Sequence, residues 1–153
     1  MNIGWVLLAE GVTLDARGAV TAVGLSQNIF PAASLPVITK RALVTHVVEE
    51  PGIIQSNSNF TISIQVKDPR DNVIVAQTAA VAIGHVPWPL LPAVTDLPLE
   101  LALNLSEYGT YRFDVQVQPP GGGAPASGSV EMYVVRPEEQ VPAPFRGNAT
   151  TDN

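Results

Sequence analysis

Strict alternation of apolar and polar residues is the feature that most constrains the fold of this chain. In residues 109–118 every second residue is apolar, and the same pattern recurs in 59–68 and 97–105. Residues two apart point to the same side of a strand, so each segment predicts a strand buried on one face only. The outward faces carry mainly Thr, Ser and Gln with few charges, so we expect contact rather than catalysis there.

Turn signals divide the rest of the chain into further strands. Residues 15–18 and 68–72 have the Asp, Asn, Gly and Pro composition of tight turns. About eight short strands with no helical segment predict a single-domain, all-β antiparallel sandwich. Besides the three alternating strands, we expect two hairpins: one pairs residues 4–14 with 19–30, and the other pairs 59–68 with 73–83. A central strand is expected at 39–49 and a final strand at 128–136.

Within the first hairpin, Gly24 is a plausible bulge or close-approach point. At the end of the central strand, the pair Glu49 and Glu50 is expected to be solvated, because the strand ends there.

Residues 105–111, LSEYGTY, resemble the tyrosine corner of immunoglobulin-like and fibronectin-like domains. In that motif a Tyr near the start of a strand bonds back to nearby backbone. The resemblance implies an immunoglobulin-like sandwich in which Tyr111 fixes a corner. The alternative is that Tyr111 is an ordinary aromatic residue of the core.

A Pro-rich segment, residues 85–98, predicts a long extended connection, because proline excludes both helix and regular sheet pairing. Inside it, Trp88, Leu90 and Leu91 stand between prolines. A stiff apolar segment of this kind loses little entropy on docking. It either caps the end of the sandwich or presents an anchor to a partner.

The composition changes again after Pro137, where the chain has the character of a disordered tail. We therefore expect a sandwich domain at 1–136 and an extended or flexible tail at 137–153. The candidate interaction residues are Trp88, Leu90, Leu91 and Phe145.

Charge and residue types exclude several classes of function. The net charge is −6, and the only basic cluster is the Lys40–Arg41 pair, so nucleic acid is not an expected partner. The chain has no cysteine, which removes thiolate nucleophiles and cysteine-ligated metals. Charged residues make up 14% of the chain, against about 25% in ordinary domains, and a surface so poor in charge suits packing against neighbours.

No apolar run is long enough to span a membrane. The apolar run at 5–9 has no basic residue before it and is interrupted by Glu10, so we read it as a strand and not as a signal peptide. The expected location is the cytoplasm, or a virion if the protein is encoded by a phage.

The residues that usually carry chemistry are sparse. His46 and His85 have no metal-ligand spacing around them, and no Gly-x-Ser-x-Gly nucleophile elbow is present. Asp68, Asp71 and Asp96 would hold calcium if they met at one edge, but Asp in such positions more often forms turns. The sequence thus predicts a protein that is not an enzyme and needs no cofactor or metal.

The opening WVLLAEGVTLDARGAVTAVGLSQNIFP and the later KDPRDNVI turn resemble a family of uncharacterised small β-sandwich proteins of bacteria and phages. That family has an acidic residue after its first apolar strand and a Tyr-rich penultimate strand. The resemblance spans most of residues 5–135. It implies a bacterial or phage origin and no assigned activity.

Two hypotheses of function follow from these patterns. The first is a non-enzymatic structural or interaction protein, an accessory subunit of a larger bacterial or phage assembly such as a capsid decoration protein. Its partners would be other proteins or further copies of itself, so a homo-oligomer or a component of a larger assembly is expected. The alternative is a sandwich that binds a small ligand or a carbohydrate, for which an exposed set of aromatic residues including Trp88 and Tyr133 would be expected.

Overall fold

Strands account for nearly all of the regular structure. The computed structural model describes residues 1–153 except 17–18, 26–27, 50, 52–58, 83–90 and 141–153. Two short 3-10 helices are described as well: η1 (Pro120–Gly122) lies between the last two strands and η2 (Pro137–Gln140) follows the last strand. The described strands are β1 (Asn2–Ala9), β2 (Gly11–Leu14), β3 (Val20–Val23), β4 (Ile29–Pro31), β5 (Val37–Glu49), β6 (Asn59–Lys67), β7 (Val73–Ala82), β8 (Ala93–Leu105), β9 (Gly109–Gln118) and β10 (Ala126–Val135).

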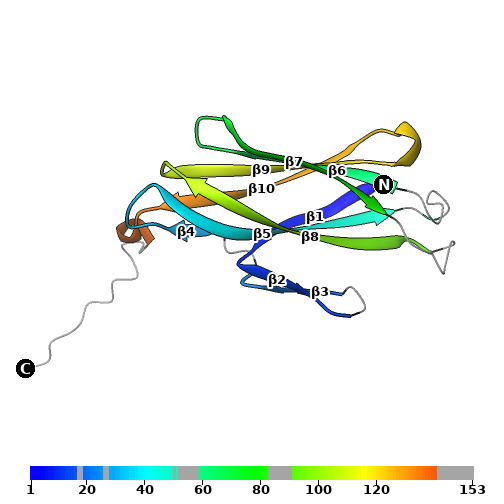
Figure 1. The fold of residues 1–153 in the computed structure, drawn as a ribbon, viewed down its shortest axis with the longest axis horizontal. Coiled ribbons are helices and arrows are strands. Elements are labelled where there is room, and N and C mark those ends of the chain that lie inside the picture. Colours follow the sequence, from blue (N-terminus) through cyan, green and yellow to red (C-terminus); the bar gives the residue numbers. More distant parts are fainter. Residues whose placement is uncertain (17–18, 26–27, 50, 52–58, 83–90, 141–153) are drawn as a thin grey trace, which may run out of the picture.

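Two sheets face each other across the core (Figure 1). One has the order β1-β5-β8 and the other the order β4-β10-β9-β6-β7, and the strand pairs are antiparallel except β4 with β10. The chain passes from the first sheet to the second after β5, returns for β8 and crosses again into β9, which is a Greek-key path. The protein is therefore an all-β, immunoglobulin-like sandwich, as predicted. Within the described residues, no helix is long and apolar enough to span a bilayer.

The core consists of the apolar halves of the alternating strands. Each fully buried apolar side chain stabilises the fold by about 1.5–3 kcal/mol relative to exposure, before entropy is counted. The prediction of three half-buried strands is confirmed. The buried residues they contribute are Phe60, Ile62, Ile64 and Val66 from β6, Leu101, Leu103 and Leu105 from β8, and Tyr111, Phe113, Val115 and Val117 from β9.

Tyr111 makes the hydrogen bonds of a tyrosine corner. Its hydroxyl donates to the carbonyl of Glu107 at 3.1 Å and accepts from the backbone N–H groups of Ser106 and Glu107 at 3.2 Å each. The side chain of Tyr111 is fully buried, while its backbone partners at Ser106 and Glu107 lie nearer the surface. Tyr111 is thus a corner residue and not only a core aromatic.

Tyr111→Phe should destabilise the protein by about 1–3 kcal/mol, because the N–H groups of Ser106 and Glu107 lose their acceptor while the ring still fills its site. Urea unfolding followed by tryptophan fluorescence measures this change. The control is Tyr133→Phe, which removes only an exposed bond to Glu131 and should cost under about 0.5 kcal/mol. Equal effects of the two variants would contradict the role of Tyr111.

The predicted N-terminal hairpin is wrong in its extent. The chain breaks at Glu10, so that β1 pairs with β5, while β4 pairs in parallel with β10 and only β2 and β3 form a hairpin. Pairing with β5 brings Leu8 fully into the core, whereas Leu14 in the hairpin stays 60% exposed. Burial of β1 in the sandwich therefore outweighs continuation of the local hairpin.

Gly24 closes this break, and its predicted role as a close-approach point is confirmed. It has a φ of +66°, and a Cβ there would lie 2.7 Å from the Cγ of Glu10. The N–H of Glu10 donates to the carbonyl of Val23 at 2.9 Å. The β2–β3 hairpin is therefore closed at its base by a tight junction between Glu10 and Gly24.

The expectation that proline would exclude regular pairing up to Pro98 is also wrong. Strand β8 begins at Ala93, and Pro98 lies opposite Val44 of β5. Because β8 is an edge strand of its sheet, a residue without an N–H is tolerated on the side that has no partner.

Gly128 allows β1 and β10 to approach each other across the sandwich. A Cβ at this position would lie 2.9 Å from Cγ2 of Val6 and 3.1 Å from Cγ2 of Ile3. Val6 is a buried, β-branched residue with little freedom to turn away. The missing side chain thus sets the distance between the two sheets at this end.

Gly128→Ala should lower the free energy of unfolding by about 1–3 kcal/mol through overpacking against Val6. Gly11→Ala is the matched control, because a Cβ at Gly11 meets no atom within 4 Å and should be neutral or slightly stabilising. Thermal unfolding of both variants checks the difference. A stable Gly128→Ala protein would show that the sheets have room to separate.

Candidate functional site

The candidate interaction residues of the sequence fall mostly outside the described residues. Trp88, Leu90 and Phe145 lie in segments 83–90 and 141–153, so their predicted roles are not tested. Leu91 is described and is 59% exposed, just before β8 begins.

Strand β7 forms one border of the five-stranded sheet and has β6 as its only described neighbour. It pairs with β6 along its whole length, from Val73 to Ala82. The ten residues, VIVAQTAAVA, include no charged residue and no proline, and most of them are exposed. Its second row of backbone N–H and C=O groups therefore has no strand partner in the described part of the chain.

The other described borders are protected in ways that β7 is not. Strand β4 has three residues and ends in Pro31, and β1 packs closely on β10. Strand β8 carries Asp96, Pro98 and Glu100 on its outward side. Charges, prolines and short length are the usual devices that prevent unwanted strand pairing. Among the described border strands, β7 is the longest that carries neither a charge nor a proline.

A mainly apolar groove of about 180 Å³ runs beside β7, between it and β8 of the opposite sheet. The inward side chains of β7 form one wall, with Gln77 opposite Ile64 in the pairing with β6. The described lining residues are Ile62, Ile64, Gln77, Thr78, Ala79, Val81, Leu97, Pro98 and Leu99. The sandwich is therefore open along the same border that exposes the unpaired backbone.

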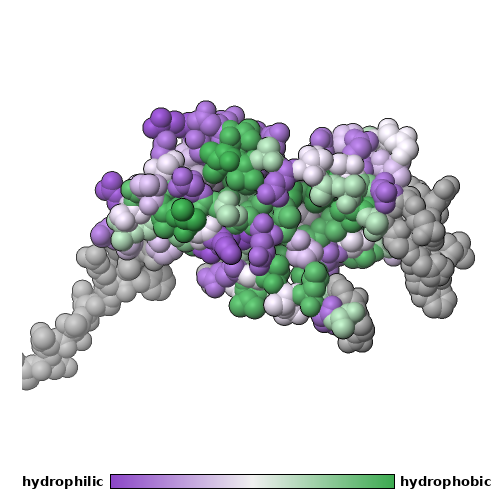
Figure 2. Space-filling model, in the orientation of Figure 1, coloured by the Kyte–Doolittle hydropathy of each residue, from purple (hydrophilic) through white to green (hydrophobic). Residues whose placement is uncertain are grey.

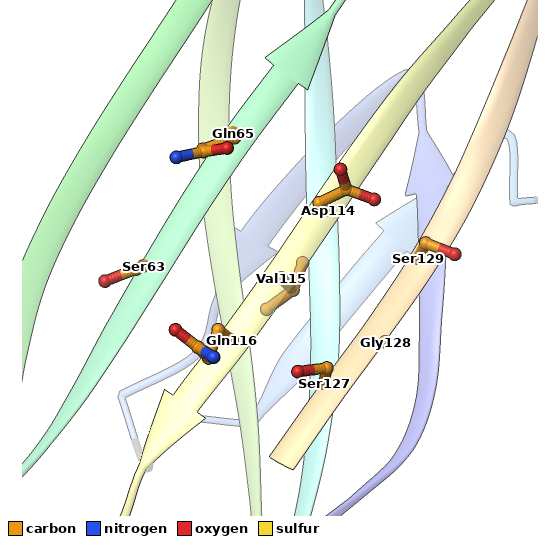
Figure 3. Close-up of a pocket in the computed structure, with 8 residues that line it drawn as sticks. All are labelled: Ser63, Gln65, Asp114, Val115, Gln116, Ser127, Gly128 and Ser129. Atoms are coloured by element: carbon orange, nitrogen blue, oxygen red, sulfur yellow. The ribbon is translucent and has the colours of Figure 1, made fainter. Parts of the chain in front are cut away.

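The outer face of the five-stranded sheet holds a polar hollow of about 440 Å³ (Figure 3). Two cross-strand rows form it, Ser63–Gln116–Ser127 and Gln65–Asp114–Ser129. Figure 3 shows these polar side chains on three adjacent strands. Apart from the bond between Ser63 and Thr78 and the ion pairs of Asp114, they make no side-chain hydrogen bond with the described part of the chain.

Charge is confined to one end of this hollow. The carboxylate of Asp114 lies 3.1 Å from Nζ of Lys67 and 3.1 Å from Nε of Arg112. Asp71 accepts from Nη2 of Arg112 at 3.3 Å. Two cations and two carboxylates thus neutralise one another, which leaves the centre of the hollow to neutral amide and hydroxyl groups.

Trp5, His46 and Asp96 form a row across the outer face of the three-stranded sheet. The rings of Trp5 and His46 stack with centroids 4.7 Å apart, and Nδ1 of His46 lies 2.7 Å from Oδ1 of Asp96. Gly4 makes room for this row, since a Cβ there would lie 2.8 Å from Cδ2 of His46. Neither partner of His46 is close to it in the sequence, so sequence patterns did not predict this row.

The three aspartates considered for calcium do not meet. Asp68 accepts from the N–H groups of Arg70 and Asn72 and so closes the β6–β7 turn, and these bonds, chiefly that from the Asn72 side chain, lower the pKa of Asp68. Asp71 shares that turn, whereas Asp96 lies on the other sheet beside His46. The described residues contain no cluster of three or more His, Cys, Asp or Glu suited to a metal ion.

Comparison with known proteins assigns no family to this chain. No family model and no curated protein matches the sequence. Among solved structures, the chain is similar to the CARDB domain of the PF1109 protein from Pyrococcus furiosus, which was crystallised in complex with di-metal ions. The identity is 8%, the TM-score is 0.41, and the match covers 88% of this chain and 93% of that one.

Apolar residues also reach the surface away from the core (Figure 2). Hydrophobic surface is visible over the β2–β3 hairpin and near the start of β7. Leu14 and Val23 of the hairpin are each 60% exposed, and Val73 and Ile74 of β7 are partly exposed. The apolar surface and the free edge thus coincide at β7.

The environment of Glu49 contradicts the sequence prediction that this side chain is solvated. Glu49 was expected to be solvated at a strand end but is only 2% exposed, and its Oε1 has no hydrogen-bond partner among the described residues. Burial raises the pKa of this carboxyl, and the positive charge of the Met1 ammonium offsets that in part. A residue can end a strand and still lie inward, because burial depends on the opposite sheet.

Glu49→Gln should stabilise the protein at pH 7. A raised pKa in the folded state means that folding binds protons, so the free energy of unfolding falls as pH rises above the ordinary value of 4.5. The gain in the free energy of unfolding of Glu49→Gln over the wild type should therefore vanish below that pH. Urea unfolding at pH 4 and pH 7 tests this, with the exposed Glu100→Gln as control. A gain that is equal at both pH values would contradict the assignment.

Proposed function

We propose that this protein is a non-enzymatic interaction module that binds another polypeptide by adding a strand to the edge of β7. The observation that carries the proposal is the ten-residue edge strand without charge or proline. Strand addition uses backbone hydrogen bonds for affinity and side-chain pockets for specificity. The groove beside β7 supplies such pockets for the inward side chains of an added strand.

The energetics favour this mode of contact. Each backbone hydrogen bond to an added strand contributes about 0.5–1.5 kcal/mol net. Inward residues of the added strand would bury apolar surface against Leu97 and Leu99 as well. The nearby outer face of β6 carries Thr61, Ser63 and Gln65, and its one charge, Lys67, is already paired with Asp114, so little unpaired charge must be desolvated when a partner docks.

The low charge of the chain supports a role within an assembly. An accessory subunit of a bacterial or phage structure, such as a capsid decoration protein, is the finer form of this proposal. The absence of a nucleophile beside His46 and Asp96 among the described contacts supports a protein without catalysis.

Site-specific photo-crosslinking tests the proposal in cells that produce the protein. A benzophenone amino acid at Ala80 of β7 should give crosslinked protein adducts, because an added strand would lie within reach. The same probe at Ser129, in the middle of the sheet's outer face, is the control and should give few. Adducts from Ser129 but none from β7 would overturn the proposal.

A neutral saccharide or polyol in the polar hollow is the second candidate function. The observation in its favour is the set of side chains without hydrogen-bond partners in the described part of the chain, Gln65, Gln116, Ser127 and Ser129. Tyr133, half-exposed on the same face, bonds to Glu131 and offers one aromatic surface. Trp88, the other expected aromatic, lies outside the described residues.

A glycan array followed by titration calorimetry tests this second function. Gln116→Ala should weaken binding of any ligand found by about ten-fold, since it removes one or two hydrogen bonds from the centre of the hollow. Thr21→Ala on the distant β3 is the control and should leave binding unchanged. A glycan array on which no saccharide binds the protein would count against this second function.

A further inference from the structure

We propose that the strand added to β7 is β7 of a second copy of this chain, paired antiparallel about a two-fold axis that passes beside Thr78. This inference rests on the proposed strand addition and names its partner. The two five-stranded sheets would then join into one continuous sheet of ten strands. The two-fold axis would be perpendicular to that sheet.

The composition of β7 suits pairing with itself. In a two-fold pair a charged residue near the axis would lie close to its own symmetry copy, and like charges placed close together across a strand pair are destabilising. Strand β7 has no charged residue between Val73 and Ala82, so this penalty is absent. The chain as a whole has a charge of −6, which makes a neutral edge the favoured place for two copies to meet.

The pattern of side chains selects the register. A two-fold axis perpendicular to the sheet keeps each face on its own side, so the residue at the axis pairs with itself. Ser63 and Thr78 bond to each other on the outer face, which places Thr78 outward and Gln77 inward. An axis at Thr78 would set Thr against Thr, a favourable cross-strand pair.

An axis at Thr78 also places similar residues of the two copies opposite each other on either side of the axis. Outward, Ala76 would lie opposite Ala80, and two small residues let the strands approach. Inward, Val75 would lie opposite Val81, next to the apolar groove of each copy. An axis at Gln77 would instead place two amides face to face beside that groove.

Charge substitution at residue 78 tests the pairing. By light scattering after size exclusion, the wild-type chain should approach twice its 16.2 kDa mass as concentration rises. Thr78→Lys and Thr78→Glu should each raise the dimer dissociation constant at least about ten-fold, because like charges would meet at the axis. An equimolar mixture of the two variants should recover the dimer.

Thr21→Lys is the matched control, because Thr21 is also an exposed strand threonine but lies on β3. It should leave the dissociation constant unchanged. Circular dichroism and melting curves show whether each variant folds. Should Thr78→Lys fail to fold, Ala80→Lys and Ala76→Glu test the same edge, since these positions would face each other across the axis.

Single cysteines give an independent test, because the chain has none of its own. Thr78→Cys should form an intermolecular disulfide under mild oxidation, since opposed Cα atoms lie about 4.5–5.5 Å apart. Gln77→Cys should not, because its two copies would be displaced by two residues and lie roughly 8 Å apart.

Two results would overturn the pairing with a second copy. The first is a wild-type chain that stays monomeric at millimolar concentration. The second is a dimer that persists in Thr78→Lys and gives no disulfide in Thr78→Cys. If either result is found but β7 still crosslinks to other proteins in cells, the proposed addition of a strand to β7 stands. Only the proposal that the partner is a second copy is then wrong.

Discussion

The hydrogen bonds of the Tyr111 hydroxyl hold the register on which most of this structure depends. Tyr111 begins the buried face of β9, and β9 lies between β10 and β6 in its sheet. A slip of one residue would turn every side chain of β9 to the opposite face. The rows of the polar hollow are aligned through β9, and β7 is placed by β6. One buried hydroxyl therefore contributes to the position of two surfaces about which functions are proposed.

The sequence predicts the alternating strands well, because burial on one face leaves a pattern that can be read locally. It predicts the corner for a similar reason, since Ser106, Glu107 and Tyr111 are neighbours in the chain. It fails at β1, whose partner β5 is decided by competition between distant strands. It fails likewise at Pro98, where tolerance of proline depends on β8 being an edge.

The edge of β7 and the side-chain groups on the sheet faces are the hardest features to predict from the sequence. The composition of β7 is plain in the sequence, but its place at the border of the sheet is a property of strand order. The row of Trp5, His46 and Asp96 joins three strands that are far apart in the chain, and no spacing rule connects them. Glu49 shows the same limit, because its burial is imposed by what packs over it. The physical chemistry of a single segment predicts whether it forms a strand or a turn. The order of the strands in the two sheets determines which surfaces and side-chain groups come together.

The polar hollow lies on the face of the five-stranded sheet that is turned away from the other sheet. If two copies joined edge to edge, both hollows would open in the same direction on one continuous surface. A polymer with repeating groups would then meet two receptors at a fixed spacing, and weak contacts at each would combine into avidity. The placement of this hollow would thus make a pair of copies a bivalent receptor without any new contact.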